Sequence, residues 1–176
     1  MVARKAPASI RLSDGTVVAG TRGWCIDPAT SQAGPDAAVV VLGSCAAITG
    51  NGRAPEPEVP GIVTVSLERD AGQVPAAADL AAFLVTETGR ALLATDGRAQ
   101  SVKVLETVIN GDRLFLRIRD ESAATGTAKE TWRALFDLGG RFVSVSLYAQ
   151  AGTPIGRDRG LATLSDQVET LAAANS

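Results

Sequence analysis

Residues 132–148, Trp-Arg-Ala-Leu-Phe-Asp-Leu-Gly-Gly-Arg-Phe-Val-Ser-Val-Ser-Leu-Tyr, carry the pattern that decides the fold. Apolar residues occupy every second position on both sides of the pair Gly139-Gly140. They are Trp132, Ala134, Phe136 and Leu138 before the glycines and Val143, Val145 and Leu147 after them. An alternation of period two on both sides of a tight turn predicts an antiparallel hairpin with one buried face.

Two other segments repeat this pattern. Residues 102–119 alternate around Asn110-Gly111, the strongest short turn signal in the chain, and residues 10–18 do so around Asp14-Gly15. Each segment is predicted to form a hairpin. Single strands are expected at Trp24–Ile26, Ala38–Leu42 and Ile62–Leu67, the second of them as a continuous apolar run buried on both faces.

Two helices are expected among these strands. The first begins after Pro75 and ends at Asp96-Gly97, with Leu80, Phe83, Leu84, Ala91 and Leu92 on its apolar side. Gly89 within it costs about 1 kcal/mol relative to alanine unless another group packs closely there. The second helix closes the chain after a loop at Pro154–Gly160, and residues 163–166 are its predicted N-terminal cap.

Strands in antiparallel pairs, with one helix midway and one at the end, indicate an α+β protein. We expect an antiparallel β-sheet built from hairpins, with the central and C-terminal helices packed on it as an α/β/α sandwich. Residues 9–174 are predicted to be a single domain, and residues 1–8 a disordered or artificially added N-terminal segment.

The chain of 176 residues contains no histidine. This composition excludes a Ser-His-Asp triad, a Cys-His pair and any histidine-ligated metal. The sequence also contains no phosphate-binding loop or dinucleotide fingerprint. A net charge of −2 argues against a dedicated nucleic-acid binder. We therefore expect a protein that is not an enzyme, with no cofactor and no metal.

The two cysteines, Cys25 and Cys45, are candidates for a disulfide. If their segments pair as neighbouring strands, the bridge is geometrically reasonable and indicates an oxidising compartment. Two buried free thiols are the alternative. A third interpretation takes Leu42-Gly43-Ser44-Cys45 as a lipidation signal, but its apolar run is short and lies far from the N-terminus.

The order of elements supports a resemblance at the level of the fold. It comprises an N-terminal hairpin, a strand reached through Gly23-Trp24, the strand at residues 62–67, a helix, two hairpins and a terminal helix. The second of those hairpins carries an aromatic residue close to Gly140. This order resembles the PsbP/Mog1-like family, which includes small bacterial periplasmic proteins. The resemblance implies an accessory protein that docks on a larger complex, and it assigns no functional residue.

One possible interaction patch is visible in the sequence. Arg113, Arg117 and Arg119 alternate along a predicted strand with Phe115 between them, and Arg133 is expected nearby. These residues fit an acidic partner with an apolar anchor. They also fit the solvated face of an antiparallel sheet, or a helix-covered face with extended arginine stems.

Together these observations predict a non-enzymatic accessory or binding protein that docks on another protein. The alternative is a small-molecule or lipid carrier, or a hydrolase without histidine, that uses a cavity between sheet and helix. We expect a periplasmic or secreted location, with the signal peptide absent from the printed chain; the alternative is cytoplasmic. No stretch approaches the ~20 apolar residues that a transmembrane helix needs. The identity of the partner and the oligomeric state are left open.

Overall fold

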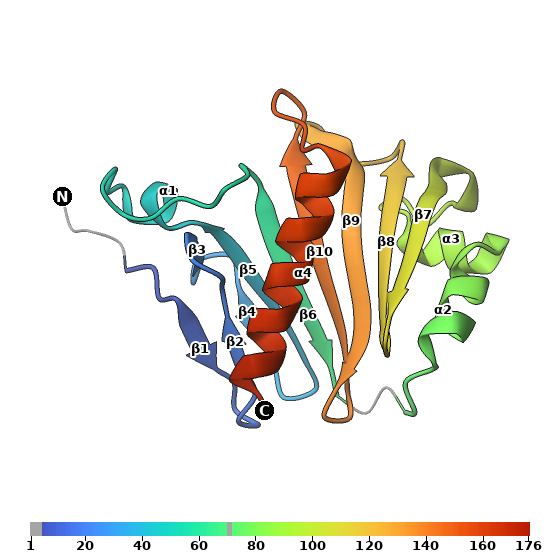
Figure 1. Ribbon diagram of the computed structural model, residues 1–176, viewed down its shortest axis with the longest axis horizontal. Helices are drawn as coiled ribbons and strands as arrows, with labels where there is room; N and C mark the ends of the chain where they lie inside the picture. Colours follow the sequence, from blue (N-terminus) through green and yellow to red (C-terminus); the bar gives the residue numbers. More distant parts are fainter. Residues whose placement is uncertain (1–4, 70–71) are drawn as a thin grey trace.

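The computed structural model describes residues 5–69 and 72–176 of the chain. Its strands are β1 (Ser9–Arg11), β2 (Val17–Ala19), β3 (Trp24–Ile26), β4 (Gln32–Ala33), β5 (Ala37–Ser44), β6 (Ile62–Glu68), β7 (Val102–Asn110), β8 (Arg113–Asp120), β9 (Thr127–Leu138) and β10 (Arg141–Gln150). Among the described residues, eight of these strands form one antiparallel sheet in the order β3-β5-β6-β10-β9-β8-β7, with β4 beside β5 (Figure 1). The predicted α+β class is confirmed.

The predicted hairpins are all present. Leu138 pairs with Arg141 across Gly139-Gly140, Asn110 pairs with Arg113, and β1 pairs with β2. The expectation that β5 is buried on both faces is wrong. Its residues alternate between the core and a more open second face, so that Val40 is fully buried while Val39 is 41% exposed.

The C-terminal helix α4 (Arg157–Ala174) crosses one face of the sheet (Figure 1). It begins at Arg157, earlier than the predicted cap at residues 163–166. Residues 157–160, which were expected to end a loop, are therefore its first turn. Gly160 lies directly on the indole of Trp132, and a Cβ there would overlap the ring. The absence of a side chain at Gly160 therefore lets the backbone of α4 rest on the buried tryptophan.

Two amide side chains, Gln167 of α4 and Asn175 at its C-terminal cap, hold the free edge of β2. Gln167 accepts from the N–H of Thr21 at 3.2 Å and donates to the carbonyl of Ala19 at 2.7 Å. Asn175 makes the same pair of bonds with the backbone of Val17, at 2.8 Å each. These side chains replace the neighbouring strand that this edge of the hairpin lacks.

The expected central helix is two helices, α2 (Ala77–Leu84) and α3 (Glu87–Leu93). Thr86 separates them: its hydroxyl donates to the carbonyl of Phe83 at 2.6 Å and accepts from the N–H of Gly89 at 3.2 Å. Gly89 has the close neighbour that the sequence argument required, since a Cβ there would be 2.5 Å from the Cα of Leu84. The glycine thus permits the tight corner between the helices.

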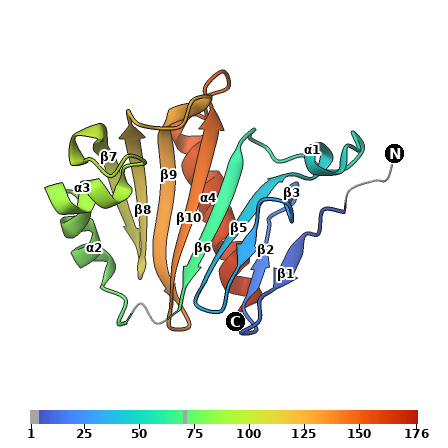
Figure 2. The ribbon, with the colours of Figure 1, turned by 180° about the vertical axis from the view of Figure 1, so that it is seen from behind.

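The helices cover the two faces of the sheet unequally. On one face, α4 seals an apolar core of aliphatic and aromatic residues over the middle strands. On the other, α2 and α3 pack mainly on β7, β8 and the adjacent part of β9, together with the 3-10 turn at Ala99–Ser101. Figure 2 shows that β6 and β10 carry no helix on this second face. None of the helices in the described residues is long and apolar enough to cross a membrane.

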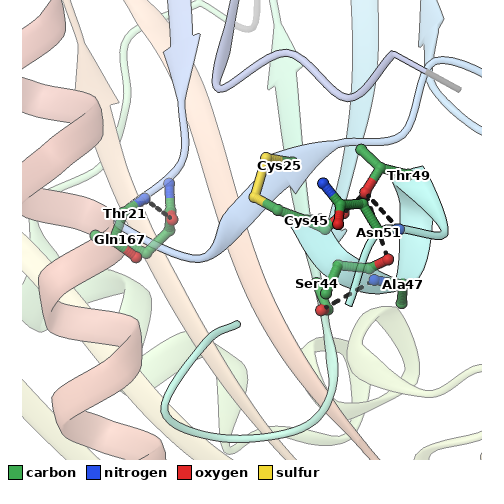
Figure 3. Close-up of a disulfide and its surroundings, with 9 residues drawn as sticks. Thr21, Cys25, Ser44, Cys45, Ala47, Thr49, Asn51 and Gln167 are labelled. Carbon is green, nitrogen blue, oxygen red and sulfur yellow. Dashed lines mark hydrogen bonds between the residues drawn. A yellow bond between two sulfur atoms is a disulfide. The ribbon is translucent and has the colours of Figure 1, made fainter. Parts of the chain in front are cut away.

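Cys25 and Cys45 form a disulfide (Figure 3). Cys25 lies on β3 opposite Gly43 of β5, and Cys45 is the first residue of the short helix α1 (Cys45–Thr49). Their Cα atoms are 4.9 Å apart and both residues are buried. The predicted bridge is confirmed, and it fixes α1 to the sheet.

The predicted disordered segment is partly ordered. Residues 1–4 lie outside the described part of the chain. Pro7 and Ala8, however, accept backbone hydrogen bonds from Ile26 at 2.8 Å and Gly20 at 2.9 Å. The ordered part of the chain therefore begins before Ser9.

We expect Gly160→Ala to lower the free energy of unfolding by about 2 kcal/mol or more, because the methyl group must displace α4 from Trp132. This result would reverse the usual gain of a Gly-to-Ala change within a helix. Chemical denaturation measures the loss. Gly152→Ala is the matched control, because its Cβ meets open space. Equal stabilities for the two variants would contradict the packing argument.

We expect thiol titration of the denatured, unreduced protein to find no free cysteine. The double variant Cys25→Ser/Cys45→Ser should lose about 3 kcal/mol of stability, because the bridge closes a loop between residues separated by 20 positions. Two titratable thiols would show that the bridge does not form in the protein as isolated.

Candidate ligand-binding trough

The predicted arginine patch lies on the face of the sheet that carries α4. Phe115 is 5% exposed and belongs to the core, so it is not an accessible anchor. Arg113 pairs with Glu169 of α4 and lies over the ring of Phe136, 5.9 Å from its centre. These contacts attach the C-terminal helix to β8 and β9.

The other two arginines of this strand are paired with carboxylates. Arg117 lies 3.6 Å from Glu106 and 3.3 Å from Glu130, and Arg119 lies 2.6 Å from Glu121. Glu106 also accepts two hydrogen bonds from Arg157, whose guanidinium, with Arg117, holds the pKa of Glu106 below its ordinary value. The face is a network of ion pairs rather than a free cationic patch.

Arg133 lies on the opposite face, away from these residues. It is directly opposite Leu116 in the β8–β9 register and opposite Ser146 in the β9–β10 register. Its Nε donates to the hydroxyl of Ser146 at 3.1 Å. Among the described residues, no carboxylate lies within ion-pair distance of its guanidinium.

The side chains around Arg133 form a trough with a volume of about 700 Å³. Its floor is the uncovered face of β6 and β10, where Thr64, Ser66, Ser144 and Ser146 form a block of two facing pairs. The same strands present valines and leucines to α4 on their other face. The floor is low because these four side chains are small and no helix packs on them.

One wall of the trough is apolar. It consists of Leu80, Phe83 and Leu84 of α2 and Leu92 and Leu93 of α3. Phe142 and Tyr148 lie on the floor at opposite ends of the hydroxyl block. The trough therefore combines a polar floor with an aliphatic and aromatic side, as sites for small molecules commonly do.

The floor offers more hydrogen-bond donors than the protein uses. In the part of the chain that the structure describes, the hydroxyls of Thr64, Ser66, Ser144 and Tyr148 have no protein partner. The terminal nitrogens of Arg133 have none either. These donors face solvent or a ligand. Glu68, exposed at one end of the trough, contributes its carboxylate.

A smaller cavity of about 200 Å³ continues the trough beneath α3 and shares Leu93, Arg133 and Tyr148 with it. Its buried acid, Asp120, accepts from the backbone and hydroxyl of Thr95 at 2.9 and 2.8 Å, and from those of Ser122 at 2.9 and 2.5 Å. Burial alone would raise the pKa of Asp120, but these hydrogen bonds outweigh it and hold the pKa below its ordinary value. Asp120 serves to fasten the loops after α3 and β8.

On the same face a groove of about 640 Å³ lies between α1, β5 and the proline-rich loop before β6. Its apolar lining includes Val41, Ile48 and Ile62, and its carboxylates are Asp27 and Glu56. Ile62 is directly opposite Tyr148 of the trough. Among the described residues, no three Asp, Glu or Cys side chains converge as metal ligands, and we assign no metal site.

A scan of protein-family models finds none that fits this chain, and a search of curated proteins finds no relative. The trough is therefore interpreted from its own geometry.

Sequence reasoning missed the trough because its floor comes from two strands far apart in the chain. The alternation of serines with valines at 143–147, and of Thr64 and Ser66 with valines, predicts a polar face for each strand separately. That these faces lie side by side is set by the β6–β10 pairing, which nothing local in the sequence indicates.

We expect Asp120 to make the protein sensitive to acid. Its folded pKa is depressed, so its contribution to stability is complete above the ordinary value of 3.8 and is lost as the pH falls through the folded pKa. Asp120→Asn should therefore be less stable at pH 7 and should lose less on acidification. Urea denaturation between about pH 6 and pH 2 measures this. Asp112→Asn, in the exposed β7–β8 turn, is the control. Parallel acid losses in wild type and Asp120→Asn would contradict the assignment.

Proposed function

We propose that this chain is a non-enzymatic binding protein that holds a small amphipathic molecule in the trough. The observation that carries this proposal is the division of one cavity, about 700 Å³ in volume, into a hydroxyl floor and an apolar wall. A molecule with one polar end and one apolar part satisfies both surfaces. Cavities of this size and composition are typical of ligand sites.

The non-catalytic role is supported by the chemistry of the floor. Its serines and threonine lie beside an arginine, a side chain that offers hydrogen-bond donors and no acceptor. A hydroxyl needs a neighbouring base to become a nucleophile. The chain also contains no histidine, the residue that most often supplies this base.

We propose a periplasmic or secreted location. The Cys25–Cys45 bridge supports it, because stable disulfides belong mainly to oxidising compartments. The cytoplasm is the alternative.

A second candidate function, docking on a partner protein, is favoured by the exposed rim of the trough. Phe83, Val85 and Leu92 on α2–α3 are 41%, 49% and 69% exposed. Adjacent exposed apolar side chains mark interaction surfaces. The resemblance to PsbP/Mog1-like accessory proteins, seen in the order of elements, supports the same function.

We expect the neutral dye Nile red to bind the protein with an increase in fluorescence, and Ser144→Phe to abolish most of this signal by filling the floor. Ala162→Phe adds the same ring to an exposed position on α4, on the other face of the sheet, and should bind like wild type. Thermal unfolding of both variants establishes that they are folded.

Dye binding that survives in a folded Ser144→Phe variant would show that the trough is not the site. If wild type itself does not bind, the carrier function is contradicted and docking becomes the better candidate. A photo-crosslinking amino acid at Leu92, with Ala162 as the reference position, then tests docking in extracts of the source organism.

A further inference from the structure

Arg133 differs from the other arginines of the eight-stranded sheet in having no carboxylate of the described residues within ion-pair distance. Arg113, Arg117, Arg119 and Arg141 each form an ion pair with a carboxylate. Arg133 has only the neutral hydroxyl of Ser146 as its partner among the described residues. A half-buried guanidinium without an anion is energetically unfavourable, and an anionic ligand would relieve this.

The hydrogen bond to Ser146 fixes which side of the guanidinium is free. Because Nε donates to Ser146 within the floor, the two terminal nitrogens remain for another acceptor. A guanidinium presents these nitrogens as a fork that matches two oxygens of a carboxylate or a phosphate. The charge is thus held in place before any ligand arrives.

The hydroxyls around Arg133 are suited to the same kind of ligand. Ser146 is directly opposite Arg133, and Thr64 is directly opposite Ser146 on the next strand. Ser144 and Tyr148 are the neighbours of Ser146 on the same face of β10. Hydroxyls donate to an oxyanion and strengthen the hold of a cation on it. The acid nearest in the smaller cavity, Asp120, already accepts four hydrogen bonds from Thr95 and Ser122.

We infer that the trough binds an amphipathic molecule with a single oxyanion head, a carboxylate or a phosphate. Arg133 binds the head, and the wall of Leu80, Phe83 and Leu92 covers the apolar chain. The inference rests on the proposed binding function and adds the charge and chemical class of the ligand.

The test compares three probes that share one tail: dodecanoate, dodecyl phosphate and 1-dodecanol, each displacing Nile red from the trough. Wild type should bind dodecanoate or dodecyl phosphate at least about tenfold more tightly than dodecanol. The tighter of the two anions identifies the head. Arg133→Gln should lose that preference, so that it binds neither anion more than about twofold more tightly than dodecanol.

Two control variants separate the possible causes of a loss. Arg119→Gln removes an exposed arginine on the other face, and it should bind all three probes like wild type. Arg133→Lys keeps the charge but not the fork, and it should bind the anions with intermediate affinity. Thermal unfolding of Arg133→Gln beside wild type establishes that the variant is folded.

Equal binding of dodecanol and the anions by wild type, or full anion binding by Arg133→Gln, would overturn the assignment of Arg133 while leaving the binding function in place. Failure of wild type to bind any probe or the dye would instead overturn the proposed function itself. These two failures are distinguishable in the same titration.

Discussion

The contact between Gly160 of α4 and the indole of Trp132 is the constraint on which the two-faced sheet depends. Trp132 is fully buried at the centre of the sheet, and the glycine lets the helix backbone approach its ring. The indole nitrogen has no hydrogen-bond partner in the described residues, so packing alone supplies the stabilisation. Because α4 is seated at this contact, its leucines and valine close the core over β6 and β10, and its Gln167 and Asn175 reach the edge of β2. One helix thus completes one face of the sheet and also secures the N-terminal hairpin.

The opposite face follows from the same strands. In the middle of β6 and β10 the residues that alternate with the core valines are Thr64, Ser66, Ser144 and Ser146, which are small and hydroxylated, so a second helix would find little apolar surface there. On β8 the alternating residues are Leu114, Leu116 and Ile118, and there α2 and α3 do pack. The boundary between apolar and hydroxyl positions across the sheet therefore sets where the second layer stops. The trough lies at that boundary, and this explains why its wall is apolar and its floor polar.

Much of the fold could be predicted from the sequence because its signals are local. Asn110-Gly111 and Gly139-Gly140 define hairpins whose register the turn itself determines. The disulfide could be predicted because Cys25 lies in one expected strand and Cys45 follows another, and pairing of these strands brings the two cysteines together. The face of the sheet on which each side chain lies could not be predicted from the sequence. Phe115 faces α4, whereas Arg133 faces the trough, although both alternate with apolar neighbours. Because β8 and β9 are buried on both faces, alternation alone does not indicate which helices cover which of the two sets of side chains. The division of the central helix into α2 and α3 and the start of α4 at Arg157 were not predicted for a related reason. Gly89 and Gly160 are poor helix formers, and the close contacts that favour glycine at these positions are tertiary.

The two faces also differ in how they treat charge, and this difference bears on function. Around α4 the arginines form ion pairs with glutamates. These pairs neutralise the charges on that face and hold its elements together. In the trough the terminal nitrogens of Arg133 and the hydroxyls of Thr64, Ser66 and Ser144 have no hydrogen-bond acceptor among the described residues, although Nε of Arg133 donates to Ser146. Substitution of the floor by valines or leucines would give a wider apolar surface for packing. The hydroxyls also keep the open face hydrated when it is empty, which avoids the large bare apolar patch that would promote association. A polar floor beside an apolar wall is therefore the arrangement expected of a surface that must be stable empty and still receive an amphipathic ligand.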